Sequence, residues 1–201
     1  MKSFTVSLEF TEPILGSQPT RDVATDYIHA TALEKNPELA EGLEEELETL
    51  PEALERGTTV FHKVDDKPVL WDYQIRGFIK EWGLALSGDG VVSGVKNLRS
   101  KLDNFVYVTP RTIPLEMPEC GITFNERPLR AMTAKGPRVS LARSEQAPAG
   151  TRIAFTVHIV KDGEITEKVI RALLDMGQWK GLGQWRNGSW GRFTYTMEAT
   201  A

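Results

Sequence analysis

The sequence predicts an α+β protein of the ferredoxin-like (RRM-like) class, in which helices cover one face of an antiparallel sheet. Three observations predict it: an alternating N-terminal segment, two amphipathic helical segments, and further alternating segments between and after the helices. The order strand, helix, strands, helix, strand is that of a ferredoxin-like core. We therefore expect a single domain over residues 1–201, interrupted by a helical acidic insertion at about residues 16–66.

The strands are predicted where polar and apolar residues alternate. Residues 3–10 (SFTVSLEF) and 152–160 (RIAFTVHIV) alternate most clearly, and shorter strands are expected at 105–108, 127–133, 138–143 and 192–197. Pro110, Pro114 and Pro118 mark an extended or looped stretch that cannot belong to a central strand.

Helices are predicted at residues 72–86, with Asp72 as N-cap, and at 166–176. A turn at Lys67–Pro68 separates the first of them from the insertion. The predicted core is apolar and comprises Val6, Leu8, Ile75, Ile79, Ile153, Phe155, Val157, Ile170 and Leu173.

The composition, with 40% hydrophobic and 26% charged residues, is that of a globular chain. No apolar run is long enough to cross a membrane and the N-terminus lacks a signal-peptide core, so we expect a cytoplasmic protein. Cys120 is the only cysteine, and the three histidines are widely spaced. We therefore expect no metal site and no cofactor.

Charge is unevenly distributed along the chain. Residues 1–66 hold 15 acidic and 5 basic residues, whereas residues 67–201 hold 13 acidic and 19 basic ones. Most of the acid lies in residues 34–55, where leucines recur at helical spacing. This pattern predicts a solvated amphipathic helix; the alternative is an acidic surface that mimics nucleic acid or docks on a basic partner.

A basic segment spans residues 127–152, in which Glu145 is the only acid. Its cations are Arg127, Arg130, Lys135, Arg138, Arg143 and Arg152. Clustered Arg and Lys can supply the phosphate contacts of nucleic-acid binding, although solvated strand faces would have the same composition.

The segment 181–193 (GLGQWRNGSWGRF) interleaves glycine, aromatic and basic residues. Its glycines permit a close backbone approach, so that consecutive N–H groups can face a phosphate. Trp185 and Trp190 offer faces for base stacking, and Arg186, Asn187 and Arg192 offer charge and hydrogen bonds. The alternative is a tight turn with both tryptophans packed inward.

The same loop resembles the glycine-rich loop of the RAMP superfamily, the ferredoxin-like modules of CRISPR effector backbones and of guide-RNA-processing endoribonucleases. The strand opened by PAGT (148–151) and the helix before the loop are similar in order, and PVLWDYQIRGFIK (68–80) resembles the entry to the first RAMP helix. Here the loop reads GxG, four residues, GxxG, where the family has GxG, five residues, GxG. The resemblance implies a single RAMP-like domain, RNA as ligand, and modules that stack side by side as oligomers.

Three stretches also resemble a family of small proteins from phages and prophages of Gram-positive bacteria: RPLRAMTAKGPRVSLARSE, DYQIRGFIKE and GLGQWRNGSWGRF. This resemblance implies a phage-encoded protein that acts in the host cytoplasm. It implies no particular activity.

These observations lead to a non-enzymatic module that binds RNA or single-stranded nucleic acid. The candidate contacts are Arg76, Lys80, Arg127, Arg130, Arg138, Arg143, Gly181, Gly183, Trp185, Arg186, Asn187, Gly188, Gly191 and Arg192. One alternative is a protein–protein interaction module acting on a host or phage protein. A second is a metal-independent endoribonuclease, for which the resemblance leaves His29 and His62 as weak catalytic candidates, since His158 is expected to be an exposed strand residue.

Overall fold

A computed structural model describes residues 1–19, 58–86, 92, 95–133, 136–161, 163 and 165–200, with side chains left out at 129–133 and 136–141. His29 and the predicted helices of the acidic insertion lie outside these residues. The chain divides into two compact units. Unit 1 comprises Met1–Gly16, Phe61–Thr123 and Gln146–Ala201, and unit 2 comprises Ser17–Val60 and Phe124–Glu145.

A four-stranded antiparallel sheet forms the centre of unit 1. Its strands are β1 (Lys2–Phe10), β7 (Val106–Thr109), β11 (Arg152–Ile159) and β12 (Phe193–Ala199). They follow the order β12-β1-β11-β7, so the first strand of the chain lies inside the sheet. The register pairs Val6 with Phe155 on one side and with Met197 on the other.

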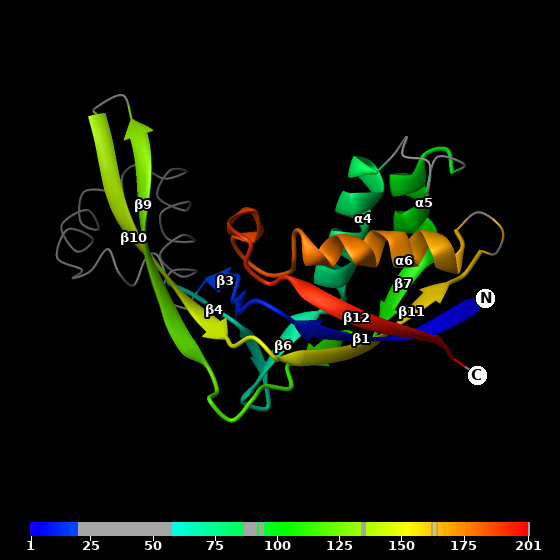
Figure 1. The fold of residues 1–201 in the computed structure, drawn as a ribbon, viewed down its shortest axis with the longest axis horizontal. Helices are drawn as coiled ribbons and strands as arrows, with labels where there is room; N and C mark the ends of the chain where they lie inside the picture. Colours follow the sequence, from blue (N-terminus) through cyan, green and yellow to red (C-terminus); the bar gives the residue numbers. More distant parts are fainter. Residues whose placement is uncertain are drawn as a thin grey trace, which may run out of the picture. The chain divides into compact units, whose positions relative to one another are not determined.

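The alternation of apolar and polar residues in the sequence places these two kinds of side chain on opposite faces of the sheet. One face is apolar and lies under helices α4 (Asp72–Ala85), α5 (Leu98–Phe105) and α6 (Glu167–Asp175) (Figure 1). All nine predicted core residues are buried there, each at most 3% exposed. The opposite face of β1, β11 and β12 carries polar side chains, among them Ser3, Thr5 and Thr156.

The helices confirm two predictions and add an element. Helix α4 begins at Asp72 as predicted, but its N-cap is Trp71, whose backbone N–H donates to the side chain of Gln74 at 2.8 Å. Asp72 is therefore wrong as the N-cap and occupies the first helical position, where a carboxylate also favours the helix. Thr166 caps α6 by accepting from the N–H of Val169.

Helix α5 was not predicted, because Leu98 and Leu102 are its only buried residues and a single apolar pair is a weak periodic signal. Gly83 of α4 lets the two helices approach, since a Cβ at that position would lie 2.2 Å from a methyl carbon of Leu102.

A second sheet of unit 1 is built from two strands that precede α4 and one that follows β7. It has the order β5 (His62–Val64), β6 (Lys67–Trp71), β8 (Thr112–Pro114), with Pro114 on an edge strand, as expected for proline. The turn predicted at Lys67–Pro68 is wrong. The chain turns at Asp65 and Asp66, both with positive φ, and Lys67 already begins β6.

In unit 2, the predicted strands at 127–133 and 138–143 are confirmed and extended. They form β9 (Thr123–Thr133) and β10 (Gly136–Ala147), which pair with each other. Strand β10 also pairs with β4 (Thr58–Val60), which in turn pairs with β3 (Gln18–Pro19). At its end, in unit 1, β10 pairs with β2 (Ile14–Leu15).

The glycine-rich loop, residues 181–192, is fastened to the segment that follows β1. The N–H of Gly191 donates to the carbonyl of Pro13 at 2.9 Å and the N–H of Gln184 to that of Leu15 at 3.2 Å. Within the loop, the N–H of Leu182 donates to the carbonyl of Gly191 at 2.9 Å. A Cβ on Gly181 would lie 1.7 Å from that carbonyl oxygen, so only glycine fits there.

Replacing Phe155 by aspartate is expected to destabilise the fold by about 3 kcal/mol or more, because an unpaired carboxylate would be buried between β1 and the helices. The matched control is Ala154→Asp, one residue earlier on the exposed face of β11, which should stay within about 0.5 kcal/mol of wild type. Urea unfolding measures both. Equal midpoints for the two variants would show that the facing of β11 is wrong.

Replacing Gly181 by alanine is expected to cost about 1–3 kcal/mol of unfolding free energy, because the new methyl group meets backbone atoms that cannot rotate away. Gly77, in the interior of α4, has no atom within 4 Å of its Cβ position, so Gly77→Ala should stabilise the protein by about 1 kcal/mol through helix propensity. Chemical denaturation of the two variants should give opposite signs. A Gly181→Ala protein as stable as wild type would contradict the close approach in the loop.

Candidate nucleic-acid interface

Trp185 and Trp190 form an aromatic pair in the glycine-rich loop. Their ring centroids lie 6.1 Å apart with the planes inclined by 19°, and Trp185 remains 43% exposed. The ring stacks on its neighbour and still presents surface to solvent. Trp185 is therefore neither fully open for base stacking nor fully packed inward. One face of its ring packs on Trp190, and part of the ring is open to solvent.

The backbone of Trp185 is held in a strained conformation. Its φ of 54° is in the left-handed region, which is uncommon for a bulky residue. The N–H of Gly188 closes the following 3-10 turn, η3 (Arg186–Gly188), onto the Trp185 carbonyl at 2.9 Å. Gly188 also lies under the indole, where a Cβ would come within 2.9 Å of the ring.

Glu81 of α4 binds two cations, one directly before the loop and one within it. One of its carboxylate oxygens accepts from the Lys180 ammonium at 2.5 Å, and the other accepts from the Arg186 guanidinium. Partial burial would raise the pKa of Glu81, but the hydrogen bonds and charges of the two cations outweigh it and lower that pKa. The carboxylate is therefore ionised at neutral pH, and its single negative charge neutralises half of the positive charge of Lys180 and Arg186.

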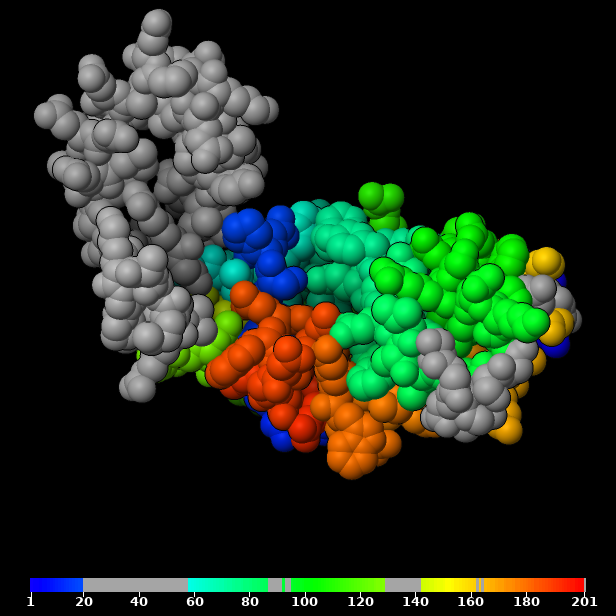
Figure 2. Space-filling view, turned by 90° about the horizontal axis from the view of Figure 1, so that it is seen from above, coloured from blue at the N-terminus to red at the C-terminus, as the bar shows by residue number. Residues whose placement is uncertain are grey.

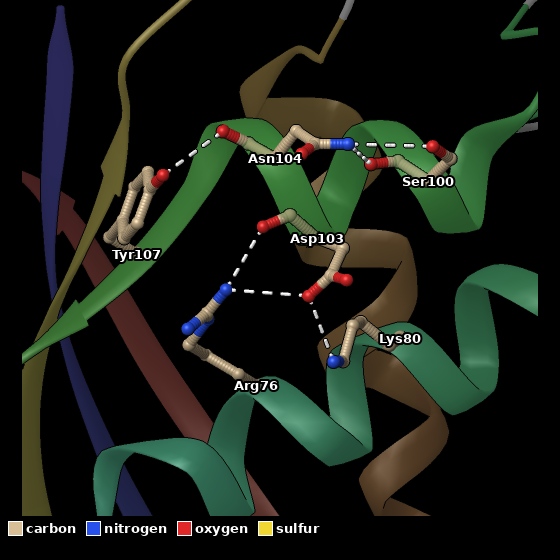
Figure 3. A network of polar contacts seen from close by, with 6 residues as sticks. All are labelled: Arg76, Lys80, Ser100, Asp103, Asn104 and Tyr107. Atoms are coloured by element: carbon tan, nitrogen blue, oxygen red, sulfur yellow. Dashed lines mark hydrogen bonds and ion pairs between the residues drawn. The ribbon is translucent and has the colours of Figure 1, made fainter.

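A second cluster lies on the same helix, where Asp103 of α5 accepts from two cations (Figure 3). The Lys80 ammonium donates to its carboxylate at 2.9 Å, and Arg76 reaches both the carboxylate at 3.4 Å and the Asp103 carbonyl at 2.9 Å. The hydrogen bond and charge of Lys80 lower the pKa of Asp103. Arg76 also lies 5.2 Å from the ring centroid of Tyr107.

A cleft of about 240 Å³ separates α4 from the loop. It is lined by Gln74, Gly77, Phe78, Glu81, Leu182, Gly183 and Arg186. Figure 2 shows the orange-red surface of the loop beside the cyan-green surface of α4. Gly77 leaves the helix backbone bare at this cleft.

The loop glycines support contacts within the protein more than contacts with a ligand. The sequence predicted consecutive N–H groups facing an anion, but those of Leu182, Gln184 and Gly191 donate to carbonyls of the protein. The N–H groups of Gly188 and Ser189 do the same within the loop.

Asn187 is exposed, and Arg192 donates to the Ser189 hydroxyl at 2.6 Å.

The predicted basic strands belong to unit 2. Arg127 is buried, at 8% exposure, and donates to the Ser144 hydroxyl at 3.3 Å; burial lowers its pKa. Arg143 lies 4.0 Å above the ring of Phe124 and pairs with Glu126 at 3.3 Å. The side chains of Arg130 and Arg138 lie outside the described part of the chain.

Of the histidines, His62 lies on β5 with its ring 4.6 Å from that of Trp71. His158 is on the polar sheet face, as predicted, and its two ring nitrogens hydrogen-bond the hydroxyls of Ser3 and Thr109 at 2.9 and 2.8 Å. Within the described ranges no three His, Cys, Asp or Glu side chains gather as metal ligands, and no helix there is long and apolar enough to cross a membrane.

Sequence reasoning did not single out Glu81, Asp103 or Lys180. Glu81 stands in the stretch DYQIRGFIKE one turn after Gly77, and Lys180 directly precedes the loop. Lys180 could have been included as a cation next to the loop, but nothing local marked Glu81, whose partners lie 99 and 105 positions away. Asp103 could not be found either, because it belongs to the helix that the sequence did not predict.

Comparisons with solved structures relate the fold to CRISPR complexes. The chain is similar to a chain of the type III-B Cmr-beta complex bound to cognate target RNA, with a TM-score of 0.55 and 12% identity over 98% of this chain and 60% of that one. It is also similar to a chain of the type IV-B CRISPR complex, with a TM-score of 0.50 and 14% identity over 99% and 91% of the two chains. This chain thus spans about 60% of the length of its Cmr-beta counterpart.

No family model matches the chain, and no curated protein matches it in sequence. At identities of 12–14%, the similarity to solved structures concerns the fold alone. The mixed α+β fold expected from the sequence is confirmed, and it is similar to the fold of chains in CRISPR complexes.

Proposed function

We propose that this chain is a non-enzymatic module that binds single-stranded RNA between α4 and the glycine-rich loop. One observation carries the proposal: Trp185 exposes an indole face and is followed by Arg186, which lines a cleft whose other wall is helix α4. Aromatic surface next to cations, at a cleft, is the combination that binds single strands.

The charge balance of this surface supports a polyanionic ligand. Arg76, Lys80, Lys180 and Arg186 are held by only two carboxylates, Asp103 and Glu81, so each cluster keeps a net positive charge. Such charge supplies the phosphate term of nucleic-acid affinity without sequence preference. A single strand is favoured over a duplex because its unstacked bases can reach an indole face.

The fold agrees with this proposal. One structural neighbour belongs to a complex bound to target RNA, and both neighbours belong to CRISPR complexes. The order β12-β1-β11-β7, with helices on one face, supports the ferredoxin-like assignment. The polar hydroxyl face of β1, β11 and β12 differs from the aromatic sheet face of RRM domains, which favours the α4 and loop side as the interface.

The other expectations from the sequence stay predictions: a single RAMP-like domain with an acidic insertion, phage origin, action in the host cytoplasm, and side-by-side assembly. The protein-docking alternative depends on residues 34–55, and the endoribonuclease alternative on His29 and His62.

The test is binding of nuclease-treated protein to labelled single-stranded RNA, single-stranded DNA and double-stranded RNA at low salt. Preferential binding of single-stranded RNA is expected. No binding to any of them would end the proposal, and recovery of a specific protein partner instead would favour the docking alternative. RNA recovered shortened after incubation in EDTA would favour the endoribonuclease.

Trp185→Ala is expected to weaken binding of single-stranded RNA by about 1–3 kcal/mol, as loss of one stacked base would. Because no charge changes, the slope of log affinity against log salt should barely move. Fluorescence anisotropy over a salt series measures both quantities. If the variant unfolds instead, the indole is a core residue and the interface is misplaced.

Arg186→Ala should lower the slope of log affinity against log salt by roughly 0.7, the value for one lost single-strand phosphate contact. Arg152→Ala is the matched control, since Arg152 also pairs with one glutamate, Glu9, at 2.8 Å but lies on the polar face of β11 and does not line the cleft. Its slope should equal that of wild type. Equal changes in the two variants would mean that only overall charge matters.

A further inference from the structure

The contacts of Glu81 do more than neutralise charge, because they also hold the loop in place. Lys180 and Arg186 bracket the first part of the loop, and the two oxygens of one carboxylate bind one cation each. Lys180 directly precedes Gly181, and Arg186 directly follows Trp185. A single side chain of α4 therefore fixes both ends of a stretch of seven residues.

The strained backbone of Trp185 requires such support. A bulky residue with φ of 54° persists only where neighbouring contacts over-determine its conformation. On one side, Trp185 is supported by the stacked ring of Trp190 and by the turn through Gly188. On the other side, the adjacent Arg186 is bound to Glu81.

We propose that Glu81 is a positioning residue for nucleic-acid binding: by holding Lys180 and Arg186, it keeps the Trp185 ring in the orientation that stacks on a base. This inference rests on the proposed function. It predicts that an acidic residue at a phosphate-binding surface strengthens binding, the opposite of what its charge alone would do.

The direction in which Glu81→Gln changes the affinity for RNA tests the proposal. Glu81→Gln removes one negative charge, so simple electrostatics predicts tighter binding. Positioning predicts weaker binding of single-stranded RNA, approaching the roughly 5- to 150-fold loss of one stacked base. Glu9→Gln is the matched control, because Glu9 also pairs with an arginine, Arg152, at 2.8 Å, but neither residue belongs to the proposed interface; this variant should bind RNA as tightly as wild type or more tightly.

A double-mutant cycle identifies the route of the effect. If Glu81 acts through Trp185, the variant carrying both Glu81→Gln and Trp185→Ala should bind within about two-fold of Trp185→Ala alone. Fully additive losses would overturn the proposal. So would a Glu81→Gln protein that binds as tightly as wild type while Trp185→Ala is weakened.

A measurement without RNA separates this inference from the proposed function. In NMR spectra of the free protein, Glu81→Gln should shift or broaden the indole N–H resonance of Trp185, assigned with Trp185→Phe, and leave that of Trp71, at the start of α4, in place as a sign of an intact fold. An unchanged Trp185 resonance would overturn the inference even if RNA binds. If wild type binds no RNA, the proposed function fails and the inference falls with it.

Should Glu81→Gln unfold, Glu81→Asp takes its place in the same measurements. It keeps the charge but is one methylene shorter, so it cannot reach both cations at once. The same loss of binding and the same change at Trp185 are expected; full retention of both would overturn the proposal.

Discussion

The antiparallel pairing of β1 with β11 on one side and β12 on the other is the constraint on which the rest of unit 1 depends. It brings together segments from both ends of the chain and from its middle, and it turns one apolar row of each strand toward α4 and α6. The segment that follows β1 then provides the carbonyls of Pro13 and Leu15, to which the glycine-rich loop is bound. The sheet and the candidate interface thus depend on the same N-terminal residues.

Two clusters of charged residues on α4 have the same composition, one carboxylate with two cations. Each carboxylate binds two cations, which orders long flexible side chains and still leaves positive charge at the surface. Exposed ion pairs of this kind add little stability, because solvent screens them and ordering the side chains costs entropy. Their value is in positioning, since an arginine already fixed by a carboxylate loses less freedom when it meets a phosphate.

The loop illustrates how glycine can be required by the protein as well as by a ligand. Gly181 and Gly191 allow two backbone segments to touch, and Gly183 allows contact with Ile14 and Leu15. With many N–H groups occupied in this way, the loop presents side chains instead: one indole face and one guanidinium. Two non-glycine residues of the loop, Trp185 and Ser189, have positive φ, and Trp185 is the one that exposes aromatic surface.

The sequence by itself determined the alternating strands, the two longer amphipathic helices and the nine core residues, because burial imposes periods of two and 3.6 residues that can be read locally. The sequence also singled out the glycine-rich loop as a candidate binding surface, which stays a prediction. Only the tertiary structure decided that Arg127 is buried, that Glu81 binds both Lys180 and Arg186, and that α5 brings Asp103 to Arg76 and Lys80. These contacts join residues between 23 and 105 positions apart, and no local pattern carries information on which distant charge a side chain will meet.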